Sequence, residues 1–537
     1  MAVRALLTAL LMASAALAHA QQATAVLGLI VKFKNAVPHE QMAAATEQPA
    51  RVAEDDRMRQ VLRVARMSEV RMRPVGRAAQ HLDFGRVLSP AEAAQLAAQL
   101  RAQPDVEWVV PNERERRLDV VPNDPMYLAG SGTTGQWWLH PVSAALPNNQ
   151  GVPGIQTAWA TEKGNASAVV AVLDTGVAAH SELGGRLLPG YDFVSEVKYA
   201  NDGGGRDTDP SDPGDWVDDN DLNDPLFAGC MAQDSSWHGT VISGILAAAT
   251  NNNIGIAGVN WNGRVLPVRV AGKCGASVAD IIDGMRWAAG LAVPNATPNA
   301  NPARVINISF GGSAACTQPY QEAIDELATH GVVVVAAAGN EMTSPTRPAS
   351  CNGVIGVAAL GRDGLKASYS NFGSKIVVST VGGDPARDDG LLTLSNLGTQ
   401  QPLGESYDRA YGTSFASPVV AGIVSLMLSA NAKLTASQIV SGLQSTARPH
   451  VAPSGVLACS TSHPGSCACT TSTCGAGIAD ADRAVQFALK APDLSGGSSS
   501  SGGGALSWPW LVGLALGVWA LSRSSGLART RRERPAQ

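Results

Sequence analysis

The stretch AVVAVLDTGV, residues 168–177, runs from six consecutive apolar residues into Asp174 and a Thr-Gly turn. Stretches with helical character separate it from three similar runs, which are GRVLPVRV (263–270), ARVINISF (303–310) and GVVVVAAAGN (331–340). Continuous apolar strands that alternate with helices are typical of a parallel sheet covered by helices on both faces. The sequence therefore predicts an α/β domain with three layers.

Three polar residues each stand at the end of one of these apolar runs. They are Asp174, Ser309 and Asn340. In such sheets the chemistry takes place on the loops beyond the carboxyl ends of the strands. Their placement therefore marks all three as candidate functional residues.

Two further motifs place a polar side chain at the start of an apolar helix. They are SSWHGTVISGILAA (235–248), which contains His238, and YGTSFASPVVAGIVSLM (411–427), which contains Ser414. Free N–H groups and the dipole at a helix N-terminus favour the negative charge that develops beside a nucleophile. A serine hydroxyl also needs a base, and the base needs an orienting partner. We expect Ser414 to attack, His238 to carry the proton and Asp174 to hold the imidazole.

An oxyanion site completes this catalytic set. We expect the Asn340 side chain and the backbone N–H of Ser414 to donate hydrogen bonds to the oxygen that becomes negatively charged.

The order Asp…His…Ser, with the motifs DTG, HGT and GTSFASP, resembles the subtilase family of serine peptidases over roughly residues 122–489. The resemblance implies a subtilisin-like fold and a serine endopeptidase that cleaves proteins and peptides through an acyl-enzyme. It also implies a set of residues that line the primary specificity pocket and pair with the substrate backbone. These are Ser309, Phe310, Gly311, Gly312, Ala336, Ala337, Ala338 and Gly339.

Two other functions fit the same motifs. The chain could be a catalytically inactive surface protein that uses the fold to bind peptides, or a protease that cuts only itself.

The N-terminal 121 residues divide into two parts. Residues 1–20 carry Arg4, an apolar run and an Ala-x-Ala end, a pattern typical of a secretory signal peptide, with an uncleaved anchor helix as the alternative. Residues 21–121 hold no cysteine and predict a small α+β domain. Its expected elements are a strand at 28–37, a helix at 49–71, a helix headed by a Ser89–Glu92 capping box and a strand at 106–111.

The subtilase resemblance implies that residues 21–121 are a pro-peptide, which acts as chaperone and inhibitor. We expect the enzyme to remove it by a cut between Arg117 and Asp124. A plain N-terminal domain is the alternative.

The C-terminal end follows the predicted catalytic domain, residues 122–490. Residues 491–505 predict a Gly/Ser linker, 506–522 a transmembrane segment and 523–537 a basic cytoplasmic tail. Together they resemble the sorting signal called GlyGly-CTERM, which a membrane protease removes. We expect a cut at about residues 502–505 and release of secreted enzyme, with a permanently anchored ectodomain as the alternative.

All eight cysteines lie between residues 230 and 474, in a part of the chain expected to reach an oxidising compartment. Pairing by neighbourhood joins Cys230 to Cys274 and Cys316 to Cys351. Two more bridges are expected within the last four, whose connectivity stays open, and a zinc knuckle is the rival interpretation there. These four are Cys459, Cys467, Cys469 and Cys474.

Residues 192–234, called the acidic segment below, carry twelve carboxylates against Lys198 and Arg206. Carboxylates two or three residues apart on a loop are typical ligands of hard cations. We expect structural calcium here, and a solvated acidic loop that favours basic substrates is the alternative. The candidate ligands are Asp207, Asp209, Asp212 and Asp215.

The amino-acid composition limits the classes of partner that the chain is expected to bind. Hydrophobic residues make up 45% and charged residues 16%, which is a globular balance, and a net charge of -5 gives no reason to expect nucleic-acid binding. We expect a monomer whose partners are protein substrates and its own pro-peptide.

Overall fold

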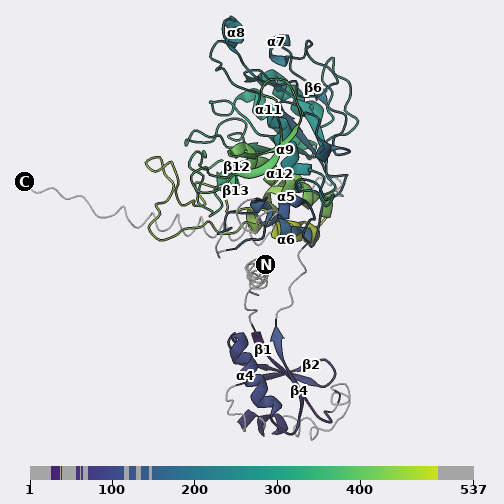
Figure 1. Cartoon of the computed structure of the whole chain (residues 1–537), viewed down its shortest axis with the longest axis vertical. Helices are drawn as coiled ribbons and strands as arrows, with labels where there is room; N and C mark the ends of the chain where they lie inside the picture. Colours follow the sequence, from purple (N-terminus) through teal and green to yellow (C-terminus); the bar gives the residue numbers. More distant parts are fainter. Residues whose placement is uncertain are drawn as a thin grey trace, which may run out of the picture. The chain divides into compact units, whose positions relative to one another are not determined.

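The computed structural model describes residues 26–36, 38, 56–60, 62–63, 70–113, 120–128, 135–143 and 148–493. The chain divides into two compact units, Met1–Leu118 and Asp119–Gln537, each described here by itself (Figure 1). The predicted signal peptide, transmembrane segment and basic tail lie outside the described residues, as does the linker beyond residue 493.

The first unit contains a four-stranded antiparallel sheet with the strand order β2-β3-β1-β4. Helix α4 packs on it with Leu29, Leu82 and Leu100 in the shared core. The strands are β1 (Val26–Phe33), β2 (Arg71–Val75), β3 (Ala79–Asp83) and β4 (Val106–Glu113), and α4 covers Pro90–Arg101. The described part of this unit therefore has the expected α+β composition.

Two local predictions in this unit need correction. Arg71 begins β2, so the helix predicted at 49–71 is too long, and the described helical residues nearby are 56–60 and 62–63. At α4, Ser89 accepts a hydrogen bond from the backbone N–H of Glu92 at 3.2 Å, which is half of a capping box. The Glu92 carboxylate binds Arg86 instead of completing it.

The second unit contains a seven-stranded sheet with the order β13-β12-β11-β10-β5-β7-β6, and every neighbouring pair runs parallel. The strands are β5 (Val169–Asp174), β6 (Tyr191–Asp192), β7 (Arg264–Arg269), β10 (Val305–Ile308), β11 (Val333–Ala337), β12 (Ile355–Leu360) and β13 (Ile376–Val381). Four of these seven strands lie in the apolar runs quoted above.

Helices cover both faces of this sheet (Figure 1). Val170 and Val172 of β5 pack toward α9 and α12, while Ala171 and Leu173 pack toward α10 and α11. This alternation follows from the two-residue period of a strand. The bounds are α9 (His238–Ala247), α10 (Val278–Ala288), α11 (Gln318–Thr329), α12 (Thr413–Ala430), α13 (Ala436–Thr446) and α14 (Ala481–Lys490). The predicted three-layer α/β fold is confirmed.

Shorter elements complete the second unit. Two small antiparallel ladders join β14 (Leu391–Asn396) to β15 (Glu405–Ala410) and β8 (Ala271–Gly272) to β9 (Gly275–Ala276). The short helices are α5 (Pro125–Leu128), η1 (Trp137–Leu139), α6 (Ile155–Trp159), η2 (Ser181–Leu183), α7 (Val197–Ala200), α8 (Asp219–Leu222) and η3 (Pro225–Phe227).

Helix α12 is the one helix among the described residues that is long and apolar enough to cross a membrane. It is 78% buried inside the protein, where it packs against α9 and the sheet, so we identify it as a core helix.

Four disulfides stabilise this unit and include all eight cysteines. Cys230–Cys274 and Cys316–Cys351 form as predicted, and the connectivity left open is Cys459–Cys467 with Cys469–Cys474. The sulfurs of Cys459, Cys469 and Cys474 lie within 4.8 Å of one another, but each belongs to a disulfide. A zinc knuckle does not fit this arrangement, since zinc binds free thiolates.

Candidate active site

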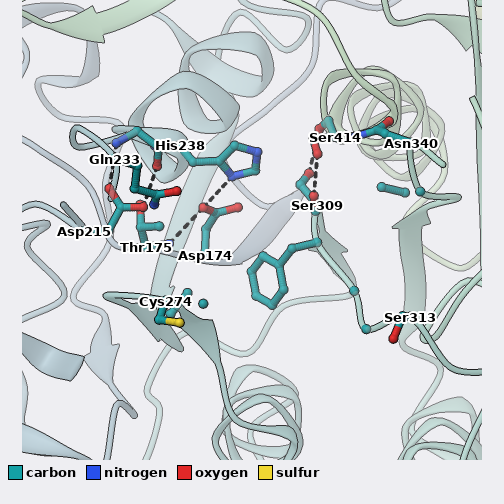
Figure 2. A pocket seen from close by; sticks show the side chains of 18 of the residues that line it. Asp174, Thr175, Asp215, Gln233, His238, Cys274, Ser309, Ser313, Asn340 and Ser414 are labelled. Carbon is teal, nitrogen blue, oxygen red and sulfur yellow. Dashed lines mark hydrogen bonds and ion pairs between the residues drawn. The ribbon is translucent and has the colours of Figure 1, made fainter. Parts of the chain in front are cut away.

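The predicted catalytic side chains come together because each is fixed to the end of a regular element. Asp174 is the last residue of β5, His238 the first of α9 and Ser414 the second of α12, while Asn340 follows β11. All four line one cleft of about 620 Å³ at the carboxyl edge of the parallel sheet. Figure 2 shows this cleft from close by.

Asp174 and His238 form a direct hydrogen bond. The imidazole Nδ1 lies 2.8 Å from Asp174 Oδ1, and the aspartate side chain is only 1% exposed. Asp174 Oδ1 also accepts the N–H of Thr175 at 2.8 Å. Burial disfavours the imidazolium, but the negative charges of Asp174, Asp215 and Asp212 outweigh it and raise the pKa of His238. The pair therefore has the geometry of an oriented general base.

A close approach between two turns determines where His238 lies. Gly176 has φ +99°. A Cβ added to Gly239 would lie 2.0 Å from the carbonyl oxygen of Gly176 and 3.2 Å from the Cβ of Asp174. At the N-cap, Trp237 has φ 52°, a left-handed conformation that is uncommon for a large side chain. Its indole Nε1 donates to the carbonyl of Gly398 at 2.6 Å. The glycines in DTG and HGT thus allow β5 and α9 to meet.

Ser414 and Asp174 lie on opposite sides of the His238 ring (Figure 2). Its hydroxyl donates to the backbone carbonyl of Ser309 at 2.6 Å. Ser309 Oγ in turn donates to the carbonyl of Ser414 at 2.7 Å and accepts from Asn307 Nδ2 at 2.8 Å. In this arrangement the Ser414 hydroxyl is bound to Ser309 and would have to turn to reach His238.

Asn340 is held beside Ser414 by α12. Its Oδ1 accepts hydrogen bonds from the N–H of Thr413 at 3.0 Å and from Thr413 Oγ1 at 2.9 Å. The side-chain nitrogen consequently lies on the Ser414 side (Figure 2). An amide donor fixed next to a helix N-terminus is suited to stabilise a developing oxyanion.

The predicted substrate-binding residues divide into two groups. Six line the cleft, namely Ser309, Phe310, Gly311, Gly312, Ala337 and Gly339. Ala336 and Ala338 are fully buried in apolar clusters. They alternate with cleft residues along the end of β11, because successive strand side chains point to opposite faces.

The four candidate calcium ligands do not converge. Among the described residues, no three of them bring carboxylate oxygens within 4.8 Å of one another. Asp207 accepts the N–H of Asp209, and Asp209 accepts that of Ser211, so both stabilise turns of their own loop. Asp212 instead binds Thr175, next to Asp174, and Asp215 binds Ser236, two residues before His238. A single calcium site made of all four does not fit this arrangement.

A second pair of carboxylates, outside the acidic segment, was missed by sequence reasoning. Glu182 is 1% exposed, and its Oε2 has no hydrogen-bond partner among the described residues. Burial, with the nearby charge of Asp124, raises the pKa of Glu182 to about 7. Asp124 is fully buried and accepts the N–H groups of Asn251 and Asn252. Two buried carboxylates that form no ion pair with any described residue have the donor chemistry of a hard-cation site.

Sequence reasoning also missed Thr175 and Ser236 as cleft residues, and it did not place the correctly predicted disulfide Cys230–Cys274 at the cleft, which all of them line. Thr175 lies within the motif DTG and Ser236 stands two residues before His238, so both positions offered a signal. The disulfide had no such signal, because the path of the loops brings it there.

Comparison with known proteins agrees with this site. The sequence pattern that defines the "Subtilase family" matches residues 165–477. The chain is 41% identical to an "Extracellular protease" of Xanthomonas campestris over 407 residues, which are 75% of this chain and 63% of that protein. It is 35% identical to an "Extracellular basic protease" of Dichelobacter nodosus, over 75% of this chain and 62% of that protein.

The solved structures include one protease from Pseudoalteromonas arctica that is 42% identical, with a TM-score of 0.60, and the match covers 69% of this chain and all of that one. The present chain spans somewhat less than two thirds of the length of the Xanthomonas and Dichelobacter proteins. The family match alone covers more than half of the chain and includes all four catalytic candidates. This chain therefore belongs to the subtilase family.

Proposed function

We propose that this chain is a secreted serine endopeptidase that hydrolyses peptide bonds in proteins. The observation that carries the proposal is the 2.8 Å bond between Asp174 and His238, in a cleft that also holds Ser414 and Asn340. A binding protein would need the cleft but not an oriented base beside a serine at a helix N-terminus.

The reaction follows from the roles of these groups. Ser414 Oγ leaves the Ser309 carbonyl, gives its proton to His238 Nε2 and forms a bond to the scissile carbonyl carbon. The carbonyl oxygen becomes an oxyanion, which accepts hydrogen bonds from Asn340 Nδ2 and the N–H of Ser414. His238 then protonates the leaving amine as the C–N bond breaks, and an acyl-enzyme remains.

Water completes the cycle. His238 removes a proton from a water molecule, whose oxygen attacks the acyl carbon, and the second tetrahedral intermediate again places its charge on the oxyanion donors. Collapse of this intermediate breaks the bond to Ser414 Oγ, which regains its proton from His238. Asp174 accepts the Nδ1–H of His238 and stabilises the imidazolium throughout.

A fluorophosphonate probe tests this function, because it reacts only with an activated serine. We expect covalent labelling of Ser414, loss of labelling and of casein hydrolysis in Ser414→Ala, and neither loss in Ser462→Ala. Ser462 is an exposed serine outside the cleft and serves as the matched control. Wild-type protein that binds peptides but takes up no probe would instead support the inactive peptide-binding protein.

We infer that residues 21–121 keep the enzyme inactive until it cuts itself between Arg117 and Asp124. The support is that unit Met1–Leu118 is compact and separate from the catalytic unit. N-terminal sequencing tests this, since material that begins near Gln21 would contradict it. In Ser414→Ala we expect the pro-segment to remain attached.

Secretion and tail removal belong to the same proposal. The names of the relatives support an extracellular location. Intact-mass measurement of the secreted form should show a chain that lacks Trp508 and the residues after it, whereas an anchored ectodomain would retain them.

We also propose that the protein binds a structural calcium ion, at residues other than the four aspartates of the acidic segment. Glu182 and Asp124 would hold the ion, and its charge would compensate the two buried carboxylates. It has no step in catalysis.

A further inference from the structure

We propose that Asp212 and Asp215 of the acidic segment are positioning residues that hold Asp174 and His238 in the geometry needed for proton transfer. The inference rests on the proposed protease function and adds two residues to its machinery. Asp212 acts through the hydroxyl of Thr175, which follows Asp174 in the sequence. Asp215 acts through the hydroxyl of Ser236, which stands two residues before His238.

Asp212 acts through Thr175. The Thr175 hydroxyl donates to Asp212 Oδ2 at 2.6 Å, and this fixes its hydrogen, so that the oxygen accepts the N–H of Gly239 at 3.1 Å. The N–H of Thr175 binds Asp174 Oδ1, and its carbonyl accepts from Arg269 Nε at 3.2 Å. A single buried threonine therefore joins the end of β5 to the start of α9.

Asp215 acts through Ser236. Its Oδ1 accepts the N–H of Ser236 at 2.6 Å and its Oδ2 accepts the Ser236 hydroxyl at 2.8 Å. Ser236 Oγ then accepts the backbone N–H of His238 at 3.3 Å. Trp237, in the N-cap position of α9, provides no side-chain hydrogen bond to the helix. Ser236, oriented by Asp215, therefore satisfies one of the free N–H groups at the helix start.

These contacts give both aspartates a role that needs no bound ion. Asp212 Oδ1 accepts the N–H of Gly214 at 2.9 Å, so all four carboxylate oxygens of the pair already accept a protein hydrogen. Both side chains are buried, at 2% and 7% exposure. An acidic loop that only attracted basic substrates would need neither burial nor these partners.

Two pairs of variants test the proposal. Thr175→Val keeps the shape of the side chain and removes the hydroxyl, whereas Thr175→Ser keeps the hydroxyl. Asp215→Ala removes the carboxylate that contacts Ser236. Its matched control is Asp219→Ala, which removes an exposed carboxylate of the same acidic segment.

The readouts are kcat and KM on a chromogenic peptide and the rate of fluorophosphonate labelling. We expect Thr175→Val and Asp215→Ala to lower kcat and the labelling rate about ten- to a hundred-fold, as small displacements of catalytic groups do, with KM changed less than about two-fold. Thr175→Ser and Asp219→Ala should stay within about two-fold of wild type.

Thermal melts of each variant serve as the control that it is folded at the assay temperature. The proposal is overturned if folded Thr175→Val and Asp215→Ala keep wild-type kcat, or if added calcium restores the activity of Asp215→Ala. Failure of wild-type protein to label would instead refute the proposed function, so the two failures are distinguishable.

Discussion

Gly239 lies so close to Gly176 that a side-chain carbon at position 239 would be 2.0 Å from the Gly176 carbonyl oxygen. Gly239 follows His238 directly, and Gly176 belongs to the turn after Asp174. The absence of a side chain at position 239 is therefore what allows base and orienting carboxylate to meet.

Gly239→Ala should accordingly damage both stability and catalysis. The new methyl group must push α9 away from the turn after β5, which costs about 1–3 kcal/mol of unfolding free energy, as other overpacked sites do. The same shift should lengthen the hydrogen bond between His238 Nδ1 and Asp174 Oδ1 and so lower kcat. Gly465→Ala, where an added Cβ meets nothing within 4 Å, is the control for melting temperature and kcat. Unchanged kcat in Gly239→Ala would show that the helix start adjusts freely.

The pH dependence of activity should reflect the raised pKa of His238. The base must be neutral to accept the Ser414 proton, so kcat/KM and the labelling rate should fall as the pH drops through that pKa. Because the neighbouring carboxylates favour the imidazolium, we expect the midpoint of the acid limb above the ordinary histidine value of about 6.5. A midpoint at or below that value would contradict the electrostatic description of the site.

Asn340→Ala should lower kcat about a hundred- to a thousand-fold with little change in KM, because the amide donates to an oxyanion that exists only beyond the ground state. Labelling of Ser414 should become slower but should still reach completion, in contrast to Ser414→Ala. If KM rose and kcat stayed constant, Asn340 would be a substrate-binding residue instead.

Removal of calcium should lower the melting temperature. With the ion absent, Glu182 and Asp124 are two buried like charges, and the folded state loses the stability that a bound cation supplies. We expect EDTA to destabilise wild-type protein at pH 8, and Glu182→Gln to have a lower melting temperature that EDTA hardly changes. An equal response of both proteins to EDTA would place the ion elsewhere.

The parallel sheet could be predicted because its strands are buried on both faces and so consist of apolar residues throughout, as in 168–173. Strand β2, with the sequence RMRPV, gave no such signal, since its residues are exposed or half-buried. Strand β15, ESYDRA, was missed for the same reason. Both are edge strands whose pairing depends on a neighbour and not on their own pattern.

The meeting of the four candidate catalytic residues in one cleft could be predicted because they occupy short motifs whose local structure places them. The supporting carboxylates could not, since Asp212 stands 38 and 37 residues from Asp174 and Thr175 along a loop rich in similar aspartates. Nothing in RDTDPSDPGDW distinguishes Asp212 and Asp215 from Asp207 and Asp209 until the chain path is known. For the same reason the sequence could not reveal that Asp212 and Asp215 accept hydrogen bonds from Thr175 and Ser236.

The bond between Cys230 and Cys274 spans 44 residues of sequence, and His238 lies between its two ends. A protease is exposed to cuts by its own copies, and Ile254, at 51% exposure, lies within this span. After one such cut, both fragments would still be joined through sulfur, and the fragment that holds His238 would stay attached to the rest of the chain. A nicked molecule would thus run as a single band until a reductant is added.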